Sequence, residues 1–137
     1  VSKVRNHATK TGWLLEIAKT IEIDKDIPLT MNGLTALKGL GRKSANVILR
    51  ETNQQAEGII CDLHVIRVAP RIGIVQESKD GNKVEKQLME ALPKKIWSEI
   101  GMAISFLGRE ICRPTPKCEE CPLTYCCQYY LLLKKGA

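Results

Sequence analysis

The sequence is poor in aromatic residues and contains no long apolar run. Phe, Trp and Tyr make up 4% of the 137 residues while 44% are apolar, so we expect an aliphatic, mostly helical core. No apolar stretch approaches the length of a membrane span, so we expect no membrane partner. No strand pattern, internal repeat or low-complexity tract stands out. These absences favour one all-α domain, or a piece of one.

We also expect no signal peptide, because no long apolar segment follows the basic residues of VSKVRNHATKTG. With no sign of export, we expect the cysteines to serve as metal ligands rather than as disulfide partners. The net charge of +6 and the pI near 9.1 suit a polyanion partner, although many ribosomal and surface proteins share such values.

Apolar residues at helical spacing predict helices along most of the chain. The expected ranges are 1–21 with an interruption at Gly12, about 30–53 around a turn, 62–72, 84–92 and 96–110. Thr30 or Asn32 is placed to cap the second range and Asp62 the third, in which Pro70 implies a kink or an early stop. The residues expected to face inward are Val4, Ala8, Leu15, Ala18, Ile21, Val84, Leu88, Ala91, Leu92, Ile100, Ala103, Ile104 and Leu107.

The stretch LTALKGLGRKSANVIL has the pattern of two helices joined by a Gly-x-Gly turn. Gly39 and Gly41 break helical propensity, tolerate positive φ and let another backbone come close. The second helix then directs its first N–H groups at whatever docks on the turn, and phosphate meets that demand. Lys43 lies in this first turn beside Arg42, where a positive charge is disfavoured and a neutral amine is a nucleophile. The plainer alternative is a helix–helix turn with two solvated cations.

The whole pattern resembles the helix-hairpin-helix motif of the DNA glycosylase superfamily that includes endonuclease III. The resemblance places the family's catalytic lysine on Lys43 and, through CDLHVIRV, its catalytic aspartate on Asp62. It implies DNA contacts from the hairpin residues Gly39, Leu40, Gly41, Arg42 and Ser44. For Asp62 the structural alternative is a helix cap, which need not exclude catalysis. For His64 and Arg67, phosphate contact and structural hydrogen bonds remain alternatives.

Five of the six cysteines fall in the segment CRPTPKCEECPLTYCC. Four thiolates this close can wrap one ion or cluster. A zinc ribbon usually has two C-x2-C pairs, and only Cys118 and Cys121 form such a pair here. Spacing alone leaves Cys126 and Cys127 both open as the last ligand. Cys61, remote from the others, is expected to be a small buried apolar residue.

The cysteine segment also resembles the 4Fe–4S loop at the end of endonuclease III-like glycosylases. That resemblance implies a 4Fe–4S cluster on Cys112, Cys118, Cys121 and Cys127, with Cys126 spare. The interval between Cys112 and Cys118 is one residue shorter than in the common family pattern, and Pro114 and Pro116 stiffen it.

The resemblance implies a base-excision repair enzyme of the cytoplasm, associated with the nucleoid. Its expected partner is double-stranded DNA with a damaged base, most plausibly an oxidised pyrimidine, or an abasic site. Its expected activity is that of a glycosylase with AP lyase action. The alternatives are a non-catalytic helix-hairpin-helix module that binds DNA and, ranked lowest, a structural zinc protein.

The resemblance also predicts the organisation of the chain. We expect a partial helical barrel over 1–111, with the hairpin unit at about 30–53, then a cluster loop over 112–127 and a tail over 128–137. The family's preceding helical region is not matched, so we expect an N-terminally truncated protein, a gene fragment or a lineage with a shortened fold. Exposed apolar helix faces would then favour self-association.

Overall fold

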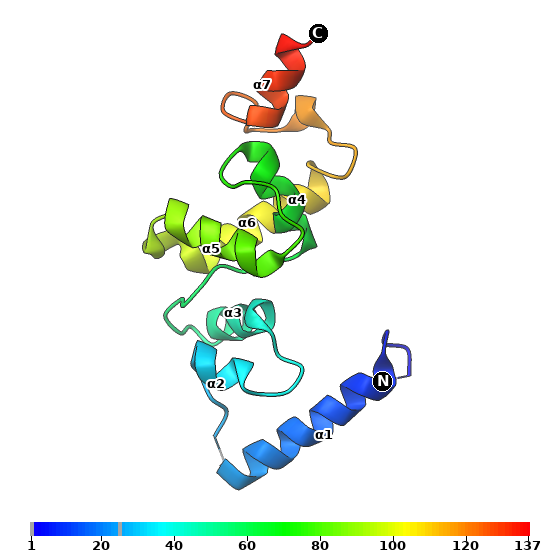
Figure 1. The fold of residues 1–137 in the computed structure, drawn as a ribbon, viewed down its shortest axis with the longest axis vertical. Coiled ribbons are helices and arrows are strands. Elements are labelled where there is room, and N and C mark those ends of the chain that lie inside the picture. Colours follow the sequence, from blue (N-terminus) through cyan, green and yellow to red (C-terminus); the bar gives the residue numbers. More distant parts are fainter. Residues whose placement is uncertain (1, 25) are drawn as a thin grey trace. The chain divides into compact units, whose positions relative to one another are not determined.

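Residues 2–24 and 26–137 are described by a computed structural model, and in these ranges the only regular elements are helices (Figure 1). The chain forms two compact units, Val1–Gln55 and Ala56–Ala137. The all-α prediction is confirmed for the described residues. None of the helices in these ranges is long and apolar enough to cross a membrane.

The first unit holds α1 (His7–Asp24), α2 (Met31–Thr35) and α3 (Arg42–Glu51). Thr30 caps α2, because its hydroxyl accepts from the backbone N–H of Gly33 at 3.1 Å. The apolar face of α3 packs on α2 around a small core of Met31, Leu34, Ala45 and Leu49. This packing sets the two helices on either side of the Gly39–Gly41 turn, as the apolar spacing predicted.

Helix α1 departs from the prediction in two ways. It runs through Gly12 without interruption, since one exposed glycine costs a helix only about 1 kcal/mol relative to alanine. Four of the five residues predicted to face inward, Val4, Ala8, Leu15 and Ala18, are exposed, and only Ile21 is half-buried as predicted. The half-buried apolar positions are Trp13, Ile17 and Ile21, four residues apart on a face that the hairpin contacts through Trp13.

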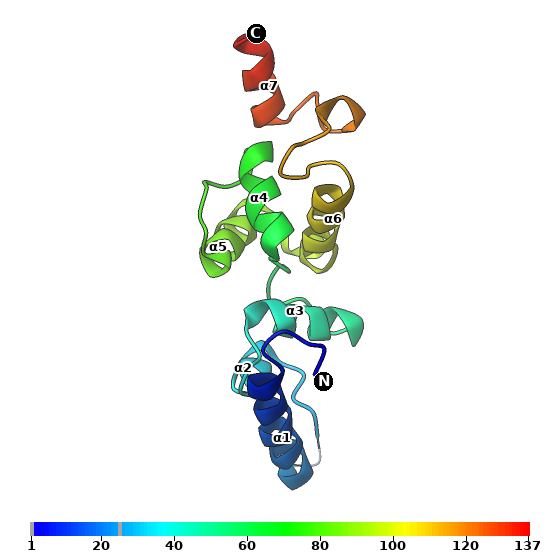
Figure 2. The same ribbon diagram turned by 90° about the vertical axis from the view of Figure 1, so that its right-hand side faces the viewer.

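The second unit holds α4 (Leu63–Ile72), α5 (Gly81–Ala91), α6 (Trp97–Glu110) and α7 (Gln128–Lys135). Short 3-10 turns occur at Lys94–Ile96 (η1) and Cys118–Glu120 (η2). Figure 2 shows α4 between α5 and α6, and the core forms where these three helices meet. The fully buried members of this core include Ile59, Val65, Val68, Val84 and Leu88.

The predicted bounds of α4, α5 and α6 agree closely with the structure, whereas α7 lies in a segment that was expected only to be a tail. Some inward positions also differ from the prediction. Ala91 and Ala103 are exposed, because a single methyl group gives a helix little reason to turn that side inward. Pro70 does not stop α4, which continues to Ile72 and ends at Gly73 in the left-handed conformation with φ +99°. Ile59 belongs to the core although it lies in an irregular segment.

Candidate active site and cysteine loop

The turn between α2 and α3 depends on one of its two glycines. Gly39 has a φ of +85°, and a Cβ there would lie 2.5 Å from the ring of Trp13. Gly41 is different, because its backbone is extended (φ −93°, ψ 178°) and a Cβ would meet nothing within 4 Å. Gly39 is therefore required by the fold, whereas Gly41 leaves open space at the start of α3.

Gly41 is the N-cap of α3 and offers no side chain to accept from the first N–H groups of the helix. No acidic residue lies in the first turn. The end of a helix in this condition carries partial positive charge and suits phosphate. Lys43 is exposed in this turn, with Arg42 and Ser44 half-buried beside it. The side chain of Leu40 is half-buried and packs on the core of the unit.

Asp62 caps α4 and is held through both carboxylate oxygens. Oδ1 accepts from the backbone N–H groups of His64 at 2.9 Å and Val65 at 3.0 Å. Oδ2 accepts from the Ser105 hydroxyl at 2.5 Å and lies 3.6 Å from the guanidinium of Arg109. The side chain is 13% exposed. The predicted cap is confirmed, and these contacts hold the carboxylate in one orientation.

The surroundings of Asp62 keep its carboxylate ionised. Burial is the largest single influence and by itself would raise the pKa of Asp62. The hydrogen bonds from Ser105 and from the Val65 N–H, the charge of His64 and the His64 N–H act in the opposite direction. Together they outweigh burial, so the pKa of Asp62 lies below its usual value. A group that stabilises developing positive charge needs this ionised form at neutral pH.

Arg67 joins α4 to the end of α6. Its guanidinium donates to the carbonyls of Gly108 at 2.9 Å and Cys112 at 3.2 Å, and lies 3.2 Å from Nδ1 of His64. Carbonyls at the C-terminal end of a helix lack donors within the helix. The Arg67 guanidinium supplies the missing donors here. Of the two alternatives for Arg67 and His64, these contacts favour the structural one.

The four cysteines that the resemblance implies as ligands line one narrow pocket of about 20 Å³. Cys126 is not part of its wall; it is exposed, and its thiol lies 3.6 Å from the carbonyl oxygen of Leu123. Burial and then the charges of Cys112, Cys127 and Cys121 raise the pKa of Cys118, so the thiols are close enough to interact. The pocket favours Cys127 over Cys126 as the fourth member.

The side chains around this pocket are not arranged as a finished metal site. Within 2–24 and 26–137, no group of three or more His, Cys, Asp or Glu side chains could hold a metal ion as it stands. The donor set nevertheless fits a thiolate-held cluster, because four cysteines line one pocket and soft thiolates select zinc or iron–sulfur clusters.

Arg71, in the last turn of α4, is a residue that the sequence analysis did not identify. Its guanidinium donates to the carbonyls of Arg113 at 2.7 Å and Pro114 at 2.9 Å, and to Cys112 Sγ at 3.6 Å. The Cys127 thiol lies 3.5 Å from the Arg71 carbonyl oxygen. Arg71 therefore fixes both ends of the cysteine loop to α4. These partners lie more than forty positions away, so no local pattern could indicate them.

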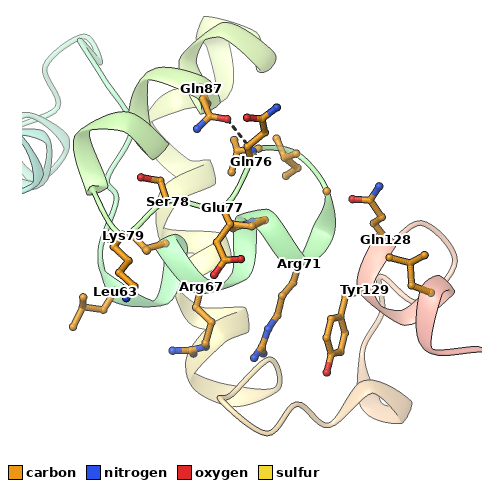
Figure 3. A pocket seen from close by; sticks show the side chains of 16 residues that line it. Leu63, Arg67, Arg71, Gln76, Glu77, Ser78, Lys79, Gln87, Gln128 and Tyr129 are labelled. Atoms are coloured by element: carbon orange, nitrogen blue, oxygen red, sulfur yellow. Dashed lines mark hydrogen bonds between the residues drawn. The ribbon is translucent and has the colours of Figure 1, made fainter. Parts of the chain in front are cut away.

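A hollow of the second unit lies apart from Asp62. It has a volume of about 930 Å³ and lies between α4, the loop after it and α7 (Figure 3). Arg71 and Tyr129 face each other on its wall, with the guanidinium 5.3 Å from the ring centroid. Asp62 is not among its lining residues, although its neighbour Leu63 is. Size alone therefore does not identify the candidate site.

Cys61, which precedes Asp62, is buried and chemically inert. Burial first, then the charges of Glu85 and Asp62, raises the pKa of Cys61 to about 12. A thiol with that pKa stays protonated and is a poor nucleophile. The prediction of a small buried apolar residue is confirmed.

The chain is 34% identical over 127 residues to endonuclease III of Synechocystis sp., across 85% of this chain and 58% of that relative. It is 38% identical over 104 residues to endonuclease III of Bacillus subtilis, across 75% of this chain and 47% of that relative. The chain is a homologue of endonuclease III. It spans about half the length of the curated relatives it matches.

Solved structures place this endonuclease III homologue in the same fold. It is 33% identical to the protein in a non-covalent endonuclease III–DNA complex (TM-score 0.68, 85% of this chain, 56% of that chain). It is 34% identical to the protein in a trapped covalent endonuclease III–DNA intermediate (TM-score 0.71, 84% and 55%). A thermostable thymine-DNA glycosylase shares the fold at 19% identity (TM-score 0.75, 90% and 59%). The fold is that of the helix-hairpin-helix glycosylases, and no protein-family model matches the chain.

Proposed function

We propose that the chain acts in DNA base-excision repair as a glycosylase with AP lyase activity, on oxidised pyrimidines. The observation that carries this proposal is the Asp62 carboxylate, which is fixed at the start of α4 and ionised at neutral pH. Relatives named endonuclease III, two of them in complexes with DNA, support it. A damaged nucleotide must leave the base stack for such chemistry.

In this proposal Asp62 supplies charge and Lys43 supplies the nucleophile. As the bond between base and sugar breaks, positive charge develops on the sugar, and a nearby carboxylate stabilises it. The neutral amine of Lys43 forms a bond to the anomeric carbon while the base leaves with the electron pair. Ring opening and proton loss then give a Schiff base. Loss of a proton from the adjacent sugar carbon expels the 3′ phosphate, which is β-elimination.

The hairpin is the proposed DNA anchor. The start of α3 presents an end without a capping side chain and an exposed Lys43. Open space beside Gly41 lets a phosphate approach the backbone closely. The contacts we assign to DNA come from Gly39, Leu40, Gly41, Arg42 and Ser44, with Leu40 acting through its backbone.

Borohydride trapping on abasic duplex DNA tests the lyase proposal. The wild-type chain should form a covalent adduct, whereas Lys43→Gln should form none, because glutamine keeps length and polarity but has no amine. Lys95→Gln, at an exposed lysine in η1, removes the same charge and should trap like wild type. An adduct at full yield with Lys43→Gln would assign the nucleophile to another amine. DNA binding without any adduct would favour the non-catalytic module.

We also propose that Cys112, Cys118, Cys121 and Cys127 hold a 4Fe–4S cluster. The shared pocket, the exposed position of Cys126 and the thiolate donor set support this assignment. A bound cluster would supply four covalent links that fasten the loop. The protein's own part is to hold the loop in place, through Arg71 and its contacts with the Arg113 and Pro114 carbonyls.

Iron and sulfide analysis of anaerobically purified protein tests the cluster. We expect about four irons and four sulfides per chain, retained by Cys126→Ser and lost from Cys127→Ser. The two variants are matched, since they remove neighbouring thiols of which only one lines the pocket. Stoichiometric zinc without sulfide would overturn the assignment, and the reverse response of the two variants would make Cys126 the ligand.

A further inference from the structure

The Asp62 carboxylate has two neighbours on α6, and they differ in kind. Ser105 is completely buried, and its hydroxyl donates to Oδ2 at 2.5 Å. Arg109 lies 3.6 Å from the same oxygen, and its side chain is 47% exposed. The guanidinium of Arg109 also lies over the exposed ring of Phe106, at 5.4 Å from the centroid.

Arg109 is poorly suited to hold a carboxylate that must act by its charge. A half-exposed ion pair contributes little because water screens it. A guanidinium also cancels the negative field that a developing cation would feel. An exposed cation is drawn to the phosphates of bound DNA, which would take Arg109 away from Asp62. Ser105 has none of these drawbacks, since it is neutral, buried and a hydrogen-bond donor.

The packing of α6 explains why so short a side chain reaches Asp62. Gly101, Ser105 and Gly108 follow at four and three positions, so they share one face of α6. A Cβ on Gly101 would collide with the backbone of Ile60, and one on Gly108 would lie 2.9 Å from the Cβ of His64. The two glycines therefore let α6 lie against the segment that carries Asp62, on both sides of Ser105.

We propose that Ser105 is a positioning residue for Asp62, holding the carboxylate toward the reacting sugar with its charge intact. This role rests on the proposed glycosylase function, in which Asp62 is the catalytic residue. The Ser105 hydroxyl donates to Asp62 and acts on the substrate through that carboxylate. Without the hydroxyl, Oδ2 loses its buried donor, and its remaining neighbour is the half-exposed Arg109, which does not hold the carboxylate in place once DNA draws it away.

A double-mutant cycle tests the proposal by single-turnover base release from duplex DNA containing an oxidised pyrimidine. Ser105→Ala should slow release by roughly tenfold to a hundredfold, the loss expected for one charge-assisted hydrogen bond. In an Asp62→Asn background the same change should add almost nothing, because Ser105 acts through the charge. Equal slowing in both backgrounds would overturn the proposal. Ser78→Ala, at a serine that accepts from the Asp80 N–H, should match wild type.

A second measurement does not depend on activity. Carbon-13 NMR of the Asp62 carboxyl should show its titration midpoint moving upward in Ser105→Ala and unchanged in Ser78→Ala. The other charged or titratable neighbours, His64 on α4, Arg109 on α6 and Cys61, are the same in each variant. An unchanged midpoint would overturn the positioning role even if base release falls. If wild type releases no base, the glycosylase proposal fails while this titration still decides the role of Ser105.

Discussion

Asp62 combines a structural duty with its proposed chemical one, and the two can be separated. Its Oδ1 caps α4 through two backbone N–H groups, and this needs only an acceptor oxygen. The proposed catalytic duty needs the negative charge. Asparagine is as good a helix cap as aspartate, so Asp62→Asn keeps the cap and removes the charge. At this residue, stability and catalysis depend on different properties of one side chain.

Asp62→Asn should slow base release by about a hundredfold or more, the scale of losing one electrostatic stabiliser. DNA binding should stay equal or become tighter, because a negative charge near phosphate is lost. Single-turnover kinetics would measure the rate of base release, and fluorescence anisotropy would measure the affinity for DNA. Asp62→Ala is the contrasting variant, since it also loses the cap and should lower the free energy of unfolding by about 1 kcal/mol. Unchanged base release in Asp62→Asn would remove Asp62 from the mechanism.

The pH dependence of folding should carry the signature of the same carboxylate. Its pKa is lowered in the folded state, so its stabilising effect is present above the unfolded value of about 3.9 and is lost as pH falls through the folded pKa. Urea unfolding of wild type and Asp62→Asn, from about pH 7 to about pH 3, should show the wild-type advantage shrinking toward the acid end. A difference between the two that stays constant over this range would contradict the lowered pKa.

At the scale of elements, the hairpin between α2 and α3 separates a glycine that the fold requires from one that we propose faces DNA. Gly39 is locked by its positive φ and by the ring of Trp13, whereas Gly41 has an ordinary extended backbone and open surroundings. The sequence shows two equivalent glycines. Only the packing of α1 on the turn distinguishes them, because Trp13 covers Gly39 and leaves Gly41 open to a ligand.

Gly41→Val should therefore fold yet bind DNA more weakly. The new side chain meets no protein atom, but it occupies the space through which a phosphate would approach the start of α3. Binding to abasic duplex DNA, titrated at several salt concentrations, should show lower affinity and a smaller loss of affinity with log salt. Gly39→Ala should instead lower the melting temperature. Gly12→Ala, at an open position of α1, should leave binding unchanged, and equal binding by Gly41→Val would count against the hairpin.

At the scale of the whole molecule, each of the two compact units carries its own core and also leaves large apolar side chains in water. On α1 these are Leu14 and Leu15, more than half exposed, and on α7 they are Leu131, Leu132 and Leu133. Apolar groups gathered on one helix favour contact with another protein surface. The net charge of +6 works against association between copies at low salt.

We accordingly expect self-association that grows with protein and salt concentration. Sedimentation velocity at two protein concentrations, each in low and moderate salt, would measure it. The double variant Leu14→Gln and Leu15→Gln should reduce association, because it replaces the exposed apolar side chains of α1 without touching a core residue. A chain that stays monomeric under all four conditions would contradict this expectation.

What the sequence by itself determined is local in origin. The caps at Thr30 and Asp62, the amphipathic α3 and the spacing of the cysteines involve residues within a few positions of each other. Helical periodicity and capping chemistry act at that range, so most of the helices could be predicted, although α7 was missed. The candidate residues came from the resemblance of these local motifs to a known family. The prediction of the buried face of α1 from periodicity was largely wrong, because a long exposed helix has several weakly apolar faces. The contact between Trp13 and Gly39 determines which of these faces is half-buried.

Only the tertiary structure decided which distant groups meet. Ser105 reaches Asp62 across forty-three positions, and Arg71 reaches Arg113 across forty-two. The pocket wall includes Cys127 and not Cys126, although the two are adjacent in the chain. Such contacts follow from how closely α4 and α6 approach, which depends on Gly101 and Gly108 fitting against another segment. A serine on a helix face carries no local sign of its partner, because that partner is chosen by packing.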